Sequence, residues 1–148
     1  MSSPGRILPI VTVDIESLDR EGRGIARVDG KAVFVDGAIT GERVECSVHK
    51  KKPSYELAEV RRVLRSSASR VEPACAHFGN CGGCAMQHVE PRMQVAAKQR
   101  VLEDCLQRIG GVTPDTLMAP IHGPAWRYRH RARLSVRLVR KKGGVLVG

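Results

Sequence analysis

Three cysteines gather within ten residues of this chain, in the segment CAHFGNCGGC, at Cys75, Cys81 and Cys84. Their spacing is C-x5-C-x2-C, and Gly82 and Gly83 allow the sharp turn that brings three thiolates to one soft metal centre. One C-x2-C pair with a third cysteine upstream is more typical of iron–sulfur ligation than of structural zinc sites, which commonly pair two such knuckles. The spacing therefore predicts a metal site and favours iron–sulfur over zinc.

The fourth ligand of such a site is not evident in the sequence. For zinc, His77 or His88 could complete the set, although each is explained more simply as a loop histidine. Cys46 falls in a predicted strand and Cys105 on the apolar face of a predicted helix, so both are expected to be packing residues. No cysteine shows a paired base and orienting group, and no complete catalytic centre is predicted.

A run of basic residues forms the second group that could bind a ligand. Between Trp126 and Lys142 there are eight Lys or Arg and no Asp or Glu. The alternation in WRYRHRARLSVRL predicts an extended strand with an apolar face and a cationic face. The alternative is the solvated face of an edge strand, but such faces normally mix charges, so this one is predicted to follow a nucleic-acid backbone. The candidate residues for this contact are Arg127, Arg129, Arg131 and Arg133.

Two further features bear on this prediction of nucleic-acid binding. The run Lys50-Lys51-Lys52 is either a solvated hairpin tip or a phosphate contact, and the sequence leaves both open. With two Tyr, two Phe and one Trp, the chain lacks the side chains for a broad base-stacking platform. Backbone electrostatics are therefore expected to dominate binding.

Composition sets the broad class of the protein. The chain has 148 residues, 42% of them hydrophobic, which is enough for a folded core, and a formal net charge of +10 that favours a polyanionic partner such as nucleic acid. We find no long apolar run and no signal-peptide pattern, so a soluble, cytoplasmic protein without a membrane partner is predicted. Five cysteines, three of them clustered, point to a reducing compartment rather than a disulfide framework.

The elements that must position these groups are mainly β. Short strand-like runs with close turn signals fill residues 7–65, and Asp29-Gly30 between two of them predicts a type I′ hairpin. A five-stranded run of this length is the size of an OB-like barrel, a fold that often binds nucleic acid. Residues 66–73 have linker composition.

One amphipathic helix and a second β-region complete the prediction. The helix opens at Pro91, stops at Gly110-Gly111 and shows apolar residues at helical spacing. Prolines then predict a loop before Trp126, followed by the first strands of a β-subdomain. Because the sequence ends at Gly148 within an expected hairpin, we expect a fragment of a longer protein.

The segments GRGIARVDGKAVFVDGAITGERVE, CAHFGNCGGCAMQHV, KQRVLEDCLQRIG and WRYRHRARLSVR, in this order, resemble the N-terminal part of the bacterial uracil-5-methyltransferases of 23S rRNA. The resemblance implies a TRAM domain, an OB-like RNA-binding barrel, at residues 1–65. It further implies a linker with the cysteine cluster at 66–89, a helix at 90–111 and the start of a truncated central β-subdomain at 112–148. On this resemblance, the C-terminal methyltransferase domain is expected to be absent from this chain.

The same resemblance implies roles for particular residues. Cys75, Cys81 and Cys84 match three ligands of a 4Fe-4S cluster whose fourth ligand lies outside this chain, and Arg127 to Arg133 match a strand that helps to hold the RNA. S-adenosylmethionine would bind only to the full-length protein, where a cysteine attacks C6 of a flipped uracil. No catalytic residue has a match here, so this chain alone is expected to be inactive.

The implied partner is ribosomal RNA, and a monomer is expected. Two other interpretations compete. One is a free-standing basic RNA-binding protein with a structural zinc site. The other, a radical S-adenosylmethionine enzyme, is disfavoured because such enzymes use C-x3-C-x2-C.

Overall fold

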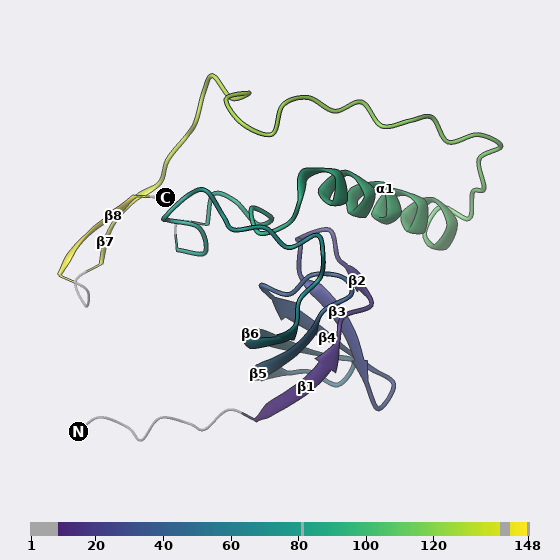
Figure 1. Ribbon diagram of the computed structural model, residues 1–148, viewed down its shortest axis with the longest axis horizontal. Helices are drawn as coiled ribbons and strands as arrows, with labels where there is room; N and C mark the ends of the chain where they lie inside the picture. Colours follow the sequence, from purple (N-terminus) through teal and green to yellow (C-terminus); the bar gives the residue numbers. More distant parts are fainter. Residues whose placement is uncertain (1–8, 81, 140–142, 148) are drawn as a thin grey trace.

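The computed structural model describes residues 9–80, 82–139 and 143–147, and these contain eight strands and one helix. In chain order the elements are β1 (Ile10–Asp14), β2 (Ser17–Leu18), β3 (Gly24–Val28), β4 (Lys31–Asp36), β5 (Arg43–Lys51), β6 (Tyr55–Arg65), α1 (Pro91–Arg108), β7 (Val136–Val139) and β8 (Gly144–Val147). The first six strands form one sheet, and β7 and β8 form a separate hairpin (Figure 1). The prediction of a mainly β chain with one helix is confirmed.

The six-stranded sheet closes on itself into a five-stranded barrel. Its strand order is β1-β5-β6-β4-β3-β2, and the two edge strands, β1 and β2, are halves of one bent segment. Between the halves, the amide of Ile15 donates to the carbonyl of Glu42 and that of Glu16 donates to the carbonyl of Ile25, both at 2.8 Å. One bent strand therefore pairs with β5 on one side and β3 on the other, which gives the OB-like closure expected from the sequence.

The predicted hairpin at Asp29-Gly30 is present between β3 and β4. Both residues have positive φ, 49° and 77°, as a type I′ turn requires, and Val28 pairs directly with Lys31 across it. β4 then runs parallel to β6, while the remaining neighbours in the barrel are antiparallel.

The interior of the barrel is filled by small aliphatic side chains. Alternate residues of each strand point inward, as the two-residue period of a strand dictates. The buried set is Val13, Ile15, Ala26, Val33, Val35, Ala38, Val44, Cys46, Val48 and Ala58. The packing is close: a Cβ at Gly24 would lie 2.9 Å from Cγ2 of Ile15 and 3.0 Å from Cβ of Ala38.

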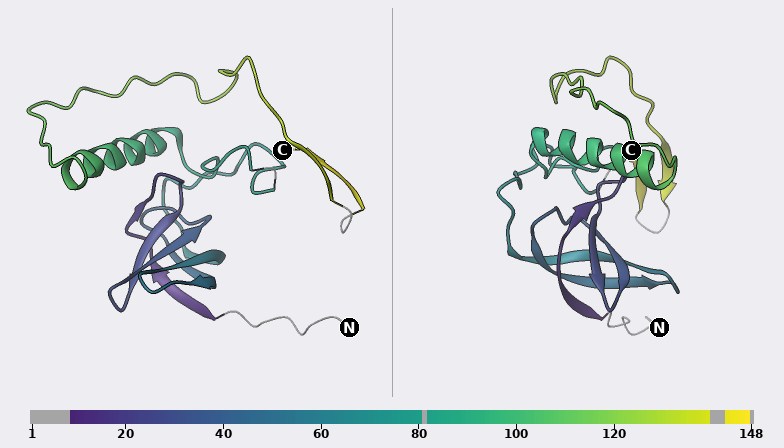
Figure 2. Two further views of the ribbon diagram at one scale, coloured as in Figure 1. Left: turned by 180° about the vertical axis from the view of Figure 1, so that it is seen from behind. Right: turned by 90° about the vertical axis from the view of Figure 1, so that its right-hand side faces the viewer.

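Helix α1 begins and ends where the sequence predicts. The Glu90 carboxylate accepts a hydrogen bond from the amide of Met93 at 3.1 Å, and Pro91 occupies the first turn, where its missing N–H is not needed. At the other end, Gly111 adopts a φ of 62°. The helix lies across one end of the barrel, as two directions of view agree (Figure 2).

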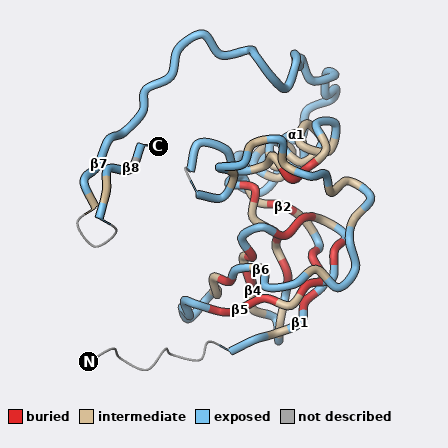
Figure 3. Tube along the Cα trace, turned by 60° about the vertical axis from the view of Figure 1, so that its left-hand side comes forward, coloured by how far each residue is buried: buried red, intermediate tan, exposed pale blue. Residues whose placement is uncertain are grey.

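The helix packs on the barrel mainly through its first half, and this corrects one expectation. Met93 and Ala97 contact a small cluster of Leu18, Ile39 and Val89, whereas the end of the helix projects past the barrel (Figure 1), and Figure 3 colours much of the helix as exposed. In its second half, Leu102 is 53% exposed and Ile109 83% exposed. Cys105 is exposed as well, so its prediction as a packing residue is wrong within this chain. The barrel end is too narrow to cover all five helical turns.

The chain after the helix also differs from the prediction. Residues 112–135 contain no regular element and run back above the helix toward β7 and β8 (Figure 1). The strand predicted to start at Trp126 begins only at Val136, where four residues pair with the four residues of β8. Before it, Arg127 has a φ of 58°, which interrupts the extended backbone. Among the described residues, no helix is both long enough and apolar enough to span a membrane.

Candidate metal loop and nucleic-acid interface

The cysteine-rich loop is built from tight turns. The amide of Phe78 donates to the carbonyl of Cys75 and that of Asn80 donates to the carbonyl of His77, both at 3.0 Å. Gly79 and Gly82 adopt φ of 81° and 72°, a conformation that side chains other than glycine adopt rarely. The loop therefore turns tightly at Gly79 and at Gly82, one of the two glycines at which the sequence predicts the sharp turn.

Two of the three predicted cysteine ligands fall in the described part of the loop. Cys84 is exposed, Cys75 is half-buried, and neither takes part in a disulfide. The amide of Cys75 donates to the side-chain carbonyl of Gln87 at 3.3 Å, which ties the beginning of the loop to its end. Cys81 lies outside the described residues. Both described thiols are accessible and unpaired, as metal ligands require.

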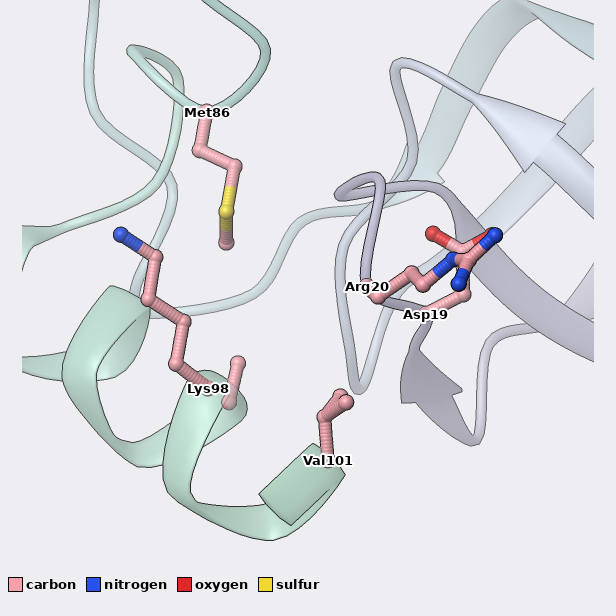
Figure 4. Close-up of a pocket in the computed structure, with 6 residues that line it drawn as sticks. Asp19, Arg20, Met86, Lys98 and Val101 are labelled. Atoms are coloured by element: carbon pink, nitrogen blue, oxygen red, sulfur yellow. The ribbon is translucent and has the colours of Figure 1, made fainter. Parts of the chain in front are cut away.

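The loop is seated on the barrel through Met86. A Cβ at Gly22, in the turn between β2 and β3, would lie 2.7 Å from Cγ of Met86 and would displace that side chain, and the φ of 81° also favours glycine. Figure 4 shows Met86 with Lys98 and Val101 of the helix, across a crevice of about 100 Å³ from Arg20 of the barrel turn. Met86 therefore joins the cysteine loop to both the barrel and the helix.

A buried ion pair fixes the linker that leads into the loop. Arg70 Nε lies 2.6 Å from Oε1 of Glu42 and its Nη2 lies 2.8 Å from Oε2, while Nη2 also donates to the carbonyl of Gly37. The Glu42 side chain is 0% exposed and also accepts from the amide of Ile39 at 3.0 Å. These hydrogen bonds outweigh the desolvation of the carboxyl and lower the pKa of Glu42.

This ion pair was not predicted. Its two residues are 28 positions apart, and no spacing rule links a glutamate in a barrel turn to an arginine of a linker. The segment 66–73 therefore has the composition of a flexible linker but is held against the barrel. Hydrogen bonds between Val71 and His88 and between Glu90 and Ser69 also join this segment to the residues just before the helix.

His88, one of the two candidate zinc ligands, is buried beneath the loop. Its ring packs against Phe78 with centroids 5.3 Å apart, and neither ring nitrogen has a hydrogen-bond partner. Burial and the positive charge of Arg70 lower its pKa, although Glu42 acts in the opposite sense. Among the described residues, no three His, Cys, Asp or Glu side chains are grouped closely enough to hold a metal ion. The described cysteines and histidines thus form no three-ligand zinc site by themselves.

Cys46 is buried in the barrel, as predicted. Its thiol lies 3.6 Å from the carbonyl of Val11, and burial raises its pKa to about 11. A protonated, inaccessible thiol is neither a metal ligand nor a nucleophile. The prediction that Cys46 is a packing residue is confirmed.

The positive charge of the chain is concentrated in its last quarter. Residues 112–148 carry eight Lys or Arg and one Asp or Glu, which gives seven of the ten net positive charges. Residues 9–65 carry eleven basic and ten acidic residues and are nearly neutral. The candidate RNA-binding arginines, Arg127, Arg129, Arg131 and Arg133, are all exposed, although they do not share a strand face.

A broad groove brings the first of these arginines near the cysteine loop. It has a volume of about 940 Å³ and is bordered by Cys84, by the first turns of α1 and by residues 122–129. Arg127 and Arg129 line it together with Arg92 and Lys98 of the helix, and the guanidinium of Arg129 lies 5.7 Å from the ring centre of Tyr128. The groove combines positive charge with an exposed aromatic ring, which suits an RNA strand.

Comparison with known proteins gives one family match and a set of close relatives. The TRAM domain model matches residues 9–60. The chain is 62% identical over 134 residues to the 23S rRNA (uracil(1939)-C(5))-methyltransferase RlmD of Aromatoleum aromaticum, which covers 90% of this chain and 31% of that protein. It is 63% identical over 134 residues to the protein of the same name from Bordetella avium, covering 90% of this chain and 28% of that one.

A solved structure also matches part of the chain. The solution structure of a conserved protein of Methanococcus maripaludis is 36% identical over 36% of this chain and 76% of that chain, with a TM-score of 0.35. The chain spans about three-tenths of the length of the curated relatives that it matches.

Proposed function

We propose that this chain, which contains a TRAM domain and matches the N-terminal part of the 23S rRNA uracil-5-methyltransferases, is the RNA-recognition and 4Fe-4S-binding portion of such an enzyme. The observation that carries the proposal is the identity of about 60% over nine-tenths of the chain. It extends beyond the barrel into the cysteine loop, the helix and the arginine-rich segment. The product would be 5-methyluridine in 23S rRNA, made in the cytoplasm.

The division of the chain follows the same relationship. We assign residues 1–65 to the RNA-binding barrel, 66–89 to the linker and cysteine loop, 90–111 to the helix and 112–148 to the start of a central β-subdomain. The barrel closure and the helix bounds support the first three divisions. We expect the chain to be a monomer.

Cys75, Cys81 and Cys84 are the proposed ligands of the cluster. The donor chemistry of the described pair fits a soft metal, since both thiols are accessible, unpaired and carried on a glycine-rich loop. A bound cluster would supply a covalent crosslink, with its fourth ligand from sequence outside this chain, and no redox step is needed for methyl transfer. The chain itself holds the cysteine loop in place, through the packing of Met86 near Gly22 and through the ion pair between Arg70 and Glu42.

The exposed arginines Arg127, Arg129, Arg131 and Arg133 are the proposed contacts to the RNA backbone. The concentration of net charge in residues 112–148 supports this assignment, because a nearly neutral barrel cannot by itself provide strong electrostatic attraction. The groove beside the cysteine loop would accommodate the RNA next to Arg127 and Arg129.

Methyl transfer itself would take place outside this chain. The S-adenosylmethionine site and the nucleophile belong to the remaining part of the full-length enzyme, so the 148-residue chain is expected to be inactive. Cys46 is not proposed as the nucleophile, because it is buried and its raised pKa keeps it protonated.

Metal analysis of anaerobically purified chain tests the proposal. Iron with acid-labile sulfide and brown absorption near about 400 nm is the expected result, with low or labile occupancy because the chain supplies only three ligands. Cys84→Ser should abolish the absorption, whereas Cys105→Ser, the matched control on the exposed face of the helix, should leave it unchanged. Colourless protein with stoichiometric zinc would instead support a free-standing RNA-binding protein with a structural zinc site.

A further inference from the structure

Two aromatic side chains lie together on the outer face of the barrel. The rings of Phe34 in β4 and Tyr55 in β6 are 5.8 Å apart and nearly perpendicular, at 81°. Phe34 occupies the middle of this face, since it pairs in register with Ile25 of β3 on one side and Leu57 of β6 on the other. Two of the five aromatic residues of the chain are thus gathered at one place on the surface.

These rings do not belong to the barrel core. The residues on either side of Phe34, Val33 and Val35, point inward and are buried, so Phe34 points outward. Both aromatic rings are half-buried, which leaves part of each open to solvent. The core itself is completed by small aliphatic side chains, so an aromatic pair on the outside is not required for its packing.

Arg23 lies over the ring of Phe34 in a fixed orientation. Its guanidinium carbon is 5.0 Å from the ring centre. Asp19 holds Nε at 2.8 Å and Nη2 at 2.6 Å, and Glu21 holds Nη1 at 3.2 Å. Because carboxylates occupy these in-plane N–H groups, Arg23 presents a planar face rather than a phosphate-binding fork. A planar guanidinium next to an aromatic ring is a surface on which nucleobases stack.

A cationic hairpin borders Tyr55. The amide of Lys52 donates to the carbonyl of Tyr55 at 2.9 Å, so Lys50, Lys51 and Lys52 lie at the adjoining tip and are exposed. The carboxylate of Glu56 lies 3.7 Å from Nζ of Lys51. Positive charge beside Tyr55 therefore suits the phosphates that flank a base.

We propose that Phe34, Tyr55 and Arg23 form a stacking site for an unpaired base of single-stranded RNA, with neighbouring phosphates at Lys50–Lys52. The inference rests on the proposed RNA-binding function and adds to it a site on the barrel. Too few aromatics are present for a broad platform, but one base needs only a local one. The barrel would contribute affinity through stacking, which responds weakly to salt, while the arginine-rich segment contributes the salt-dependent part.

Fluorescence anisotropy with the 148-residue chain and a labelled single-stranded RNA 12-mer of mixed sequence tests this site. Phe34→Leu and Tyr55→Leu should each weaken binding by about 5- to 150-fold, the usual range for one stacked base, without changing the salt slope. Leu57→Val on the same outer face is the matched control and should bind like the unaltered chain. Circular dichroism verifies that each variant is folded.

A second probe separates stacking from charge. On an abasic 12-mer, which keeps the phosphates but has no bases, both aromatic variants should bind as well as the unaltered chain. If both variants bind the mixed-sequence RNA as tightly as the unaltered chain does, the inference is overturned. The proposed function would still stand in that case, whereas failure of the unaltered chain to bind the 12-mer would overturn both.

Discussion

Replacing Arg70 by methionine should destabilise the fold by removing one partner of the buried ion pair with Glu42. The Glu42 side chain is 0% exposed, and it would keep only the amide of Ile39 at 3.0 Å and the distant amide of Ser67 at 3.4 Å as donors. Removing one member of a buried ion pair lowers the free energy of unfolding by roughly 3–5 kcal/mol. Because the Arg70 side chain is 26% exposed, we expect a value near the lower limit, about 3 kcal/mol.

Urea unfolding followed by far-ultraviolet circular dichroism measures this cost. Tryptophan fluorescence is unsuitable, because Trp126 lies outside the barrel in an exposed segment. The partner variant Glu42→Gln should cost less, about 1–2 kcal/mol, since Arg70 can turn to water and still reach the carbonyl of Gly37. The double variant should then reveal a coupling energy of at least about 1 kcal/mol.

The pH dependence of the unfolding free energy tests the same ion pair independently. The folded state lowers the pKa of Glu42, so its contribution to stability is present above the pKa of the unfolded chain and is lost as pH falls through the folded value. In Arg70→Met the hydrogen bonds and the charge of Arg70 no longer lower this pKa, so the loss of stability on acidification should become smaller or disappear. A change in unfolding free energy below about 1 kcal/mol, together with no coupling in the double variant, would refute the conclusion that the ion pair holds the linker.

Three further predictions concern the loop, the interface and His88. Gly22→Ala should destabilise the chain by about 1–3 kcal/mol in urea unfolding, because φ is 81° and the new Cβ would meet Met86 at 2.7 Å. Arg129→Ala with Arg131→Ala should lower the slope of log Kd against log salt by about 1.4, measured by anisotropy on single-stranded RNA. The unfolding free energy should fall as pH drops below about 6.5, by up to about 1.4 kcal/mol per pH unit, because the folded state lowers the pKa of His88 and the unfolded chain binds the proton first.

Each of these has a matched control. Gly37→Ala introduces the same strain at a φ of 83° but meets only an ordinary contact of 3.9 Å with Val60, so an equal loss would mean that Met86 exerts no constraint. Arg61→Ala with Arg62→Ala should leave the salt slope unchanged, and an equal decrease would argue against the C-terminal arginines. His88→Leu should remove the loss near pH 6.5, and its persistence would assign the loss to another group.

The barrel could be predicted in outline because its signals are local. Asp29-Gly30 fixes a two-residue turn through its own backbone preference, and the alternation of small aliphatic residues places the strands. The same locality explains the helix, since Glu90, Pro91 and the glycines at its end act within one turn. The candidate cysteine ligands were evident from their spacing.

Extended conformation was predicted less well where it depended on a distant partner. The alternation from Trp126 to Leu138 is strand-like, yet among the described residues only Val136–Val139 pair with β8, because a strand needs another strand to accept its backbone hydrogen bonds. The apolar stripe of α1 was likewise present in the sequence, but the barrel end covers only its first turns.

By itself, the sequence determined the class of the protein, the turns and caps of its elements, its basic charge and the thiols suited to a metal, because each depends on residue type and short spacing. Only the tertiary structure decided that Arg70 reaches Glu42, that Gly22 receives Met86 and that Phe34 meets Tyr55 on the barrel surface. These pairs lie 21 to 64 residues apart in the sequence. Barrel closure and the docking of the linker bring them together, and no local pattern encodes such contacts.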